Sequence, residues 1–229
     1  MKRTLFLLLV SSFLAGTAFG QTIDFETLPG GGAVTDGMVI HDQFNVSPYW
    51  VTFELLGVPP ETGPRIARVG PPLTAFYGPR VDNECSGENS VSDKPALNQP
   101  VGCFFLTDDD AAVLNHAYSL LVTYTYPVKQ AGGHLLDIDF GEEWTITAFA
   151  QDSTTAIDQV VLSAGDSNTG NGKATAWEFD VAQDIYFIRF ELTDCNGGGG
   201  LAFDNFSPAS SPPTATETTS WGEIKSMFR

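Results

Sequence analysis

The sequence has few basic residues. Its 229 residues include 11 Lys and Arg against 28 Asp and Glu, which gives a formal net charge of −17. Proteins bind nucleic acids largely by neutralising phosphates with Lys and Arg, so this composition argues against a nucleic-acid partner. The acidic excess is compatible with cation binding and equally with solubility alone.

Long apolar runs are also scarce. One run, residues 5–10, follows a basic start, and the small residues Ala18 and Gly20 stand where a signal peptidase reads the chain. We therefore expect residues 1–20 to be a secretory signal and the mature chain to be secreted or held at the cell surface. No later stretch approaches the ~20 apolar residues of a spanning helix, so we expect no membrane span in the mature chain.

Only three cysteines are present, Cys85, Cys103 and Cys195. In an oxidising compartment, a disulfide between Cys85 and Cys103 would close the polar loop between them. Such a bridge stabilises by on the order of 3 kcal/mol in the chain-entropy model. The alternative is a bridge between Cys103 and Cys195, because Cys195 stands at the end of an expected strand. The spacing does not match a zinc knuckle.

Segments with a helical period are nearly absent. Instead, short stretches of alternating polar and apolar residues are separated by clusters of Gly, Pro, Asn and Asp. This pattern predicts an all-β fold, a two-sheet antiparallel β-sandwich of jelly-roll type spanning residues 21–206. The expected strands are residues 22–27, 38–44, 51–56, 65–69, 102–106, 118–126, 134–140, 144–151, 159–164, 174–181, 184–193 and 201–206.

Two of these segments, residues 134–140 and 144–151, flank a corner at Gly141 and Glu142 and suggest a hairpin. The alternation places one apolar set of this hairpin in the core: Leu136, Ile138, Trp144 and Ile146. The same alternation in residues 118–126 puts Tyr126 in one inward row with Leu120, Val122 and Tyr124. We interpret the hairpin as central scaffold of the sandwich.

The composition changes after residue 206. Residues 207–219 are rich in Ser, Thr and Pro, and we expect an extended, disordered linker. Residues 220–229 have capping-box spacing at Ser220 and Glu223 and could form one short helix. This tail is either a docking or sorting element that needs a partner, or a frayed end.

The two ends of the expected domain suggest a cation site. Residues 22–27 place Asp24 and Glu26 on the face opposite Ile23, and Asp204 has the parity opposite to Phe203. If the first and last strands are neighbours, Glu26 and Asp204 meet, and loop oxygens near Asp36 complete the site. Calcium prefers such oxygen ligands. The alternative is that these acids form the solvent face of edge strands.

Aromatic residues suggest a ligand surface. Trp50 follows Tyr49 at the start of an expected strand, and Tyr77 lies in the irregular, proline-rich region 59–100. Exposed aromatic faces stack against sugar rings, so we predict Trp50 and Tyr77 as a glycan platform. Packing in the core is the alternative for each of them.

Several stretches resemble blocks of exported bacterial surface proteins, among them proteins with PEP-CTERM-type anchors. They are residues 23–29, 36–44, 101–108, 135–148 and 201–206. The resemblance implies a β-sandwich similar to lectins or carbohydrate-binding modules, in which a cation between the terminal strands is common. The chain departs from that group at its end, where we expect no such anchor.

The leading expectation is an exported, non-enzymatic β-sandwich that binds a glycan or another extracellular surface component and holds a structural calcium. One alternative is a structural envelope or matrix protein recruited through residues 220–229. The lesser alternative is a polysaccharide-degrading enzyme. Its paired carboxylates, for example Asp137 and Asp139, would have to flank a cleft.

Overall fold

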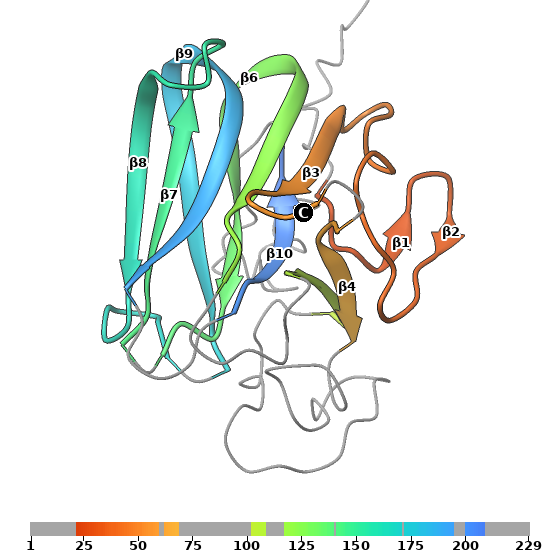
Figure 1. Cartoon of the computed structure of the whole chain (residues 1–229), viewed down its shortest axis with the longest axis horizontal. Helices are drawn as coiled ribbons and strands as arrows, with labels where there is room; N and C mark the ends of the chain where they lie inside the picture. Colours follow the sequence, from red (N-terminus) through yellow and green to blue (C-terminus); the bar gives the residue numbers. More distant parts are fainter. Residues whose placement is uncertain are drawn as a thin grey trace, which may run out of the picture.

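The computed structural model describes residues 22–59, 62–68, 102–108, 117–139, 141–170, 172–194 and 200–208 (Figure 1). These residues form ten strands and no helix. The strands are β1 (Thr27–Leu28), β2 (Gly32–Ala33), β3 (Val51–Leu55), β4 (Arg65–Arg68), β5 (Phe104–Thr107), β6 (Leu120–Leu136), β7 (Glu143–Phe149), β8 (Ala156–Ser163), β9 (Ala174–Asp194) and β10 (Ala202–Ser207). The predicted all-β class is confirmed.

Two long strands, β6 and β9, form the backbone of the fold. They pair antiparallel from Leu120 opposite Phe190 to Leu136 opposite Ala174. The register shifts on either side of Val128, and the neighbouring residues 125–127 and 182–184 are exposed. The ribbon bends there, as its arch in Figure 1 shows, so each strand contributes to both layers of a sandwich.

The first layer joins β3, the first half of β6, the second half of β9, β7 and β8. The second layer joins the first half of β9, the second half of β6, β10, β5 and β4. A separate small ribbon of β1 and β2 stands to one side (Figure 1). Hydrogen bonds make the two layers one continuous eight-stranded sheet because β6 and β9 pass through both of them.

The packing of β9 on itself demonstrates the sandwich. Trp177 and Phe190 lie on this one strand, and in an extended strand they would stand roughly 40 Å apart. Their ring centroids are 5.2 Å apart, so the two halves of β9 face each other across the core. Phe203 and Phe206 of β10 complete this aromatic centre. The predicted antiparallel β-sandwich is therefore confirmed.

The prediction of a hairpin around Gly141 is wrong. The end of β6 at Leu136 belongs to the second layer, whereas β7 belongs to the first and pairs with β8 and β9. Residues 137–142 connect the layers, with Asp137 and Gly141 both in the left-handed backbone region. The four predicted core residues are nevertheless buried: Leu136, Ile138, Trp144 and Ile146. Alternation identified the buried face correctly, but it did not identify the partner strand.

The first and last segments of the domain are neighbours, as expected. Ile23 donates to the carbonyl of Phe206 at 2.7 Å and accepts from its N–H at 2.9 Å. Neither residues 22–26 nor residues 38–44 form the strand expected there. The first segment has the bridge to Phe206, and the second has a bridge between Val39 and Arg65 with further backbone hydrogen bonds, such as that from Phe53 to the carbonyl of His41. β10 runs to Ser207, one residue beyond the expected end of the domain.

The expected signal, residues 1–20, and the tail, residues 220–229, lie outside the described residues, as does the linker beyond residue 208. They stay predictions. In the part of the chain that the structure describes, there is no helix with the length and apolar character needed to cross a membrane.

Candidate functional site

A bulge in β10 determines where Asp204 points. Phe203 and Phe206 are three residues apart, yet both side chains are fully buried in the core. A register shift between Asp204 and Ser207, with Asn205 at φ 53°, inserts the extra residue that makes this possible. Asp204 is therefore turned away from the aromatic centre, although it is only 1% exposed.

Two acids of the first segment lie close to Asp204, and we call Asp24, Glu26 and Asp204 the terminal cluster. Glu26 Oε1 accepts hydrogen bonds from the backbone N–H groups of Cys103 at 2.5 Å and Phe104 at 3.0 Å. Burial raises the pKa of Asp204 well above its ordinary value, and the negative charges of Glu26 and Asp24 raise it further. The structure thus brings together two of the three predicted metal ligands.

One oxygen of this cluster is unsatisfied. Asp204 Oδ1 accepts from the N–H of Asn205 at 2.7 Å, but Oδ2 is buried without a hydrogen-bond partner among the described residues. Its cross-strand neighbour on β6 is His134, which is 4% exposed and whose Nδ1 also lacks a described partner. Burial lowers the pKa of His134 to about 4, so the imidazole is neutral at pH 7 and supplies no charge to Asp204.

Asp36, the third predicted ligand, is placed differently. Its carboxylate accepts from the N–H of Arg68 on β4 at 2.9 Å and is exposed. Within the described ranges, no three His, Cys, Asp or Glu side chains are grouped closely enough to hold a metal ion by themselves.

Trp50 is exposed, as its predicted role requires. Trp50 is 36% exposed and Tyr126 is 60% exposed, and their rings meet edge to face at a centroid distance of 5.4 Å. Thr125 ties the two backbone segments together, because its N–H donates to the Trp50 carbonyl and its hydroxyl donates to Asn45. Val46 is exposed beside them and accepts from the N–H of Trp50. We call Val46, Trp50 and Tyr126 the aromatic surface.

Tyr126 was missed because alternation in residues 118–126 placed it in an inward row. The row is correct for Leu120, Val122 and Tyr124, which are buried. At Tyr126 the bend of β6 begins and the side chain turns outward. The available signal was Pro127, since proline cannot donate to a sheet and marks a strand edge or an irregularity.

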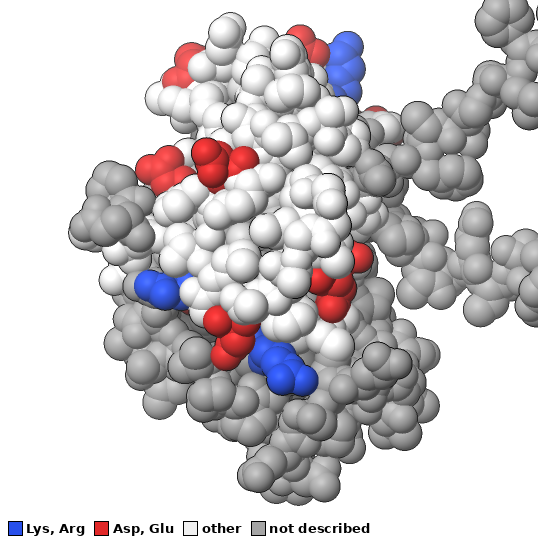
Figure 2. Space-filling model, turned by 90° about the vertical axis from the view of Figure 1, so that its right-hand side faces the viewer, with Lys and Arg blue, Asp and Glu red and all other residues white. Residues whose placement is uncertain are grey.

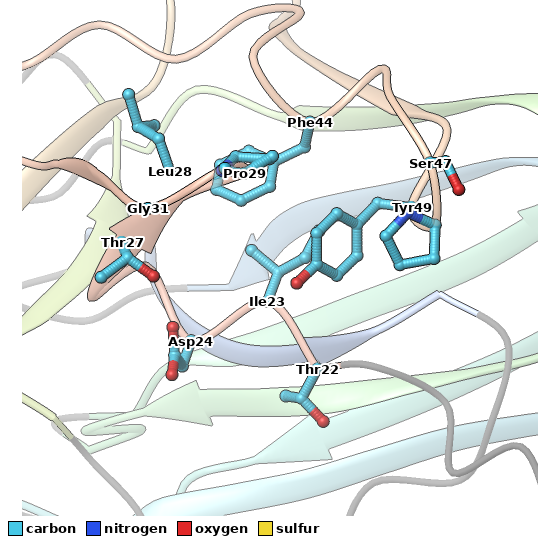
Figure 3. Close-up of a pocket in the computed structure, with 12 residues that line it drawn as sticks. Thr22, Ile23, Asp24, Thr27, Leu28, Pro29, Gly31, Phe44, Ser47 and Tyr49 are labelled. Atoms are coloured by element: carbon cyan, nitrogen blue, oxygen red, sulfur yellow. The ribbon is translucent and has the colours of Figure 1, made fainter.

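A pocket of about 490 Å³ opens between residues 22–31 and residues 44–49 (Figure 3). Its polar lining residues are Thr22, Asp24, Thr27, Ser47 and Tyr49. Its apolar walls are Ile23, Leu28, Pro29, Phe44 and Pro48. Sequence reasoning did not find this pocket, because it is formed by two loops whose approach depends on the tertiary fold.

A second group of acids, Asp137, Asp139 and Glu142, lies in the connection between the layers, and we call it the connection cluster. Asp137 Oδ1 accepts from the N–H of Gly172 at 2.6 Å. Glu142 is only 6% exposed and is hydrogen-bonded to the side chain of Trp144. Burial, and then the charges of Asp139 and Asp137, raise the pKa of Glu142 to about 8. None of these acids lines the pocket between residues 22–31 and 44–49.

The remaining predicted residues are only partly described. Tyr77 and Cys85 lie outside the described residues. Cys103 is disulfide-bonded. Its two candidate partners, Cys85 and Cys195, both lie outside the described residues, so the pairing stays a prediction.

Comparison with known proteins gives weak likenesses only. No protein-family model and no curated protein matches the chain. Among solved structures, a CBM32 module produced by Clostridium perfringens, in complex with GlcNAc-α-1,4-galactose, is 18% identical with a TM-score of 0.29. The match covers 53% of this chain and 88% of the module.

The enzymatically active domain of tailspike protein 4 from bacteriophage CBA120 is 15% identical with a TM-score of 0.35. That match covers 77% of this chain and 22% of the tailspike chain. Because both TM-scores are low, these likenesses support neither a shared family nor a shared ligand.

Proposed function

We propose that this protein is an exported β-sandwich that binds a glycan, or another component of an extracellular surface, through the aromatic surface. The exposed pair of Trp50 and Tyr126 carries the proposal. Four large apolar side chains are exposed among the described residues. Two of them, Trp50 and Tyr126, are in ring contact, and a third, Val46, is joined to Trp50 by a backbone hydrogen bond. Aromatic faces left open to water at one place are typical of a binding surface.

The backbone of Trp50 supports the same proposal. Trp50 adopts φ 54°, the left-handed region that bulky residues rarely occupy. Such a conformation costs on the order of 1–3 kcal/mol and is often found at ligand sites. The hydrogen bond from Thr125 fixes the backbone of Trp50, and the edge-to-face contact with Tyr126 restricts its ring, so less side-chain freedom is lost when a sugar stacks on it.

The test is retention on a panel of insoluble and arrayed glycans. The wild type should be retained, and Trp50→Ala and Tyr126→Ala should each lose at least about tenfold in affinity, as expected for aromatic residues at the centre of a binding surface. Val161→Ala is the matched control, because Val161 is exposed on β8, away from the aromatic surface. Unchanged binding by the Trp50→Ala, Tyr126→Ala double variant would refute the proposal.

We further propose a structural calcium at the terminal cluster. The buried, unpartnered Oδ2 of Asp204 fits a hard cation, since a carboxylate with a raised pKa ionises readily only when a positive charge offsets its burial. Glu26 and Asp204 would hold the ion and tie the first segment to β10. Equilibrium dialysis of the full chain against Ca²⁺ tests this, and Asp204→Asn should abolish the binding.

A further inference from the structure

We infer that the pocket between residues 22–31 and 44–49 is a second subsite, for a sugar residue that offers hydrogen-bond donors and carries no acid group. This inference rests on the proposed glycan binding and adds to it a location and a ligand class. The donors can be the hydroxyls of a neutral sugar or the ammonium of an amino sugar. Acidic sugars are excluded.

The charge of the pocket supports this class. Asp24 is the sole charged residue among those that line it. An ionised carboxylate only accepts hydrogen bonds, so it pairs with hydroxyl or ammonium groups and repels carboxylates and sulfates. Burial, and then the charge of Asp24, raise the pKa of Tyr49. The phenol therefore keeps its proton at neutral pH and offers a donor beside the Asp24 acceptor.

The walls of the pocket suit the faces of a sugar ring. Tyr49 is half-buried and packs edge to face against Phe44 at 5.7 Å, which fixes its ring. In Figure 3 the Tyr49 ring lies next to Ile23, and Asp24 and Thr27 lie farther to the left, beyond Ile23. The volume of about 490 Å³ is within the range of roughly 300–1,000 Å³ typical of small-molecule sites. Apolar faces and a few convergent polar groups are what a sugar residue requires.

The position of the pocket connects it with the aromatic surface. Tyr49 lines the pocket and Trp50 begins the aromatic surface, and the N–H groups of both residues donate to the carbonyl of Val46. One glycan chain can therefore place a sugar in the pocket and another on Trp50. Figure 2 shows the molecule from the side on which β1 and β2 lie, where a broad uncharged area has charged side chains scattered around it. An uncharged surface suits the binding of a ligand without acid groups.

The experiment uses the full chain and three insoluble polysaccharides: chitin, which is neutral; chitosan, which carries free amines; and cross-linked alginate, which is acidic. The wild type should be retained on chitin or chitosan and not on alginate. Asp24→Ala and Tyr49→Phe should each weaken retention at least about fivefold. Tyr49→Phe removes only a hydroxyl and keeps the ring against Phe44, so it reports on binding without disturbing the fold.

Asp42→Asn is the control, since Asp42 is exposed, lies just before Phe44 and does not line the pocket. It should bind like the wild type. If Trp50→Ala weakens retention while Asp24→Ala and Tyr49→Phe do not, the pocket inference fails and the proposed function stands. Preferential retention on alginate overturns the ligand class. Retention on none of the three overturns the inference together with the glycan function.

Discussion

The terminal cluster and the connection cluster contain the same kinds of residue but differ in how their buried oxygens are satisfied. In the connection cluster, Asp137 accepts from Gly172 and Glu142 is bonded to Trp144. In the terminal cluster, Asp204 Oδ2 is buried with no described partner. An unsatisfied buried oxygen costs roughly 1–3 kcal/mol, and more when it is charged, so Asp204 Oδ2 is the atom at which the proposed cation would have its effect. A group of acidic residues does not by itself indicate a cation site.

The largest expected effect comes from neutralising the buried acid of the connection cluster. Burial and the charges of Asp139 and Asp137 raise the pKa of Glu142 from 4.5 to about 8. A raised folded-state pKa contributes stability that is complete below about pH 4.5 and is lost as the pH rises through about 8. Between pH 5 and pH 9, the unfolding free energy of Glu142→Gln should therefore gain on the order of 3–5 kcal/mol over that of the wild type.

Urea unfolding at both pH values measures this gain. Glu178→Gln is the matched control, because Glu178 is exposed on β9. Its stability should follow that of the wild type at pH 5 and at pH 9. A constant difference between Glu142→Gln and the wild type across this range would contradict the prediction.

Calcium should affect only the terminal cluster. At a free Ca²⁺ concentration of 100 Kd, a cation that binds only the folded state stabilises it by about 2.7 kcal/mol. The melting temperature of the wild type should therefore rise with Ca²⁺ and fall with a chelator. Asp204→Asn should lose this response, because it removes the buried carboxylate, whereas Asp137→Asn should keep it. An equal shift in all three proteins would place the ion elsewhere.

A substitution at Gly102 tests how much the hydrogen bonds to Glu26 stabilise the terminal cluster. A Cβ at this position would overlap the Glu26 carboxylate, so Gly102→Ala forces that side chain aside. Glu26 then loses its hydrogen bonds from Cys103 and Phe104, and stability should fall by about 1–3 kcal/mol. Gly200→Ala is the matched control, since a Cβ there meets nothing within 4 Å. Equal melting temperatures for the two variants would show that this Glu26 contact adds little.

The smallest effect is expected for Asp137→Asn. Asp137 has φ 62°, a region that asparagine also tolerates, and an amide oxygen can still accept from Gly172. Stability at pH 7 should change by less than about 1 kcal/mol. Because a negative neighbour is removed, the pKa of Glu142 should fall, which moves the midpoint of the pH-dependent stability to lower pH. A midpoint that moves upward would contradict the assigned charge interaction.

Local alternation predicted much of the sheet. β3 and β4 lie within the predicted segments, β7 begins one residue before its segment, and Ile138, Trp144 and Ile146 are buried as expected. It failed at β6 and β9, each of which was predicted as two strands. A break in the period-two pattern looks the same whether the chain turns back or bends into a second layer. The false hairpin at Gly141 has the same cause.

The candidate site was predicted to a similar extent. We expected the terminal segments to be neighbours and Glu26 to lie near Asp204, and both are found. The pairing of Ile23 with Phe206 brings the two segments side by side, and the alternation of side chains places both acids away from the core. Asp36 instead accepts a hydrogen bond from the backbone N–H of Arg68. Its direction could not be predicted, because a residue in a loop does not follow the alternation of a strand. Trp50 was found, but its partner Tyr126 was not. The pocket could not be predicted, because no local pattern specifies how two loops approach.

The sequence by itself determined the strand class and most of the buried face, because both follow from the alternation of neighbouring side chains along the chain. Tertiary structure alone decided that β6 and β9 bend through both layers and that Trp50 meets Tyr126. It also decided that one acid cluster is satisfied while the other keeps a buried, unpartnered oxygen. These features depend on contacts between residues far apart in the chain, and local sequence does not encode the geometry of such contacts.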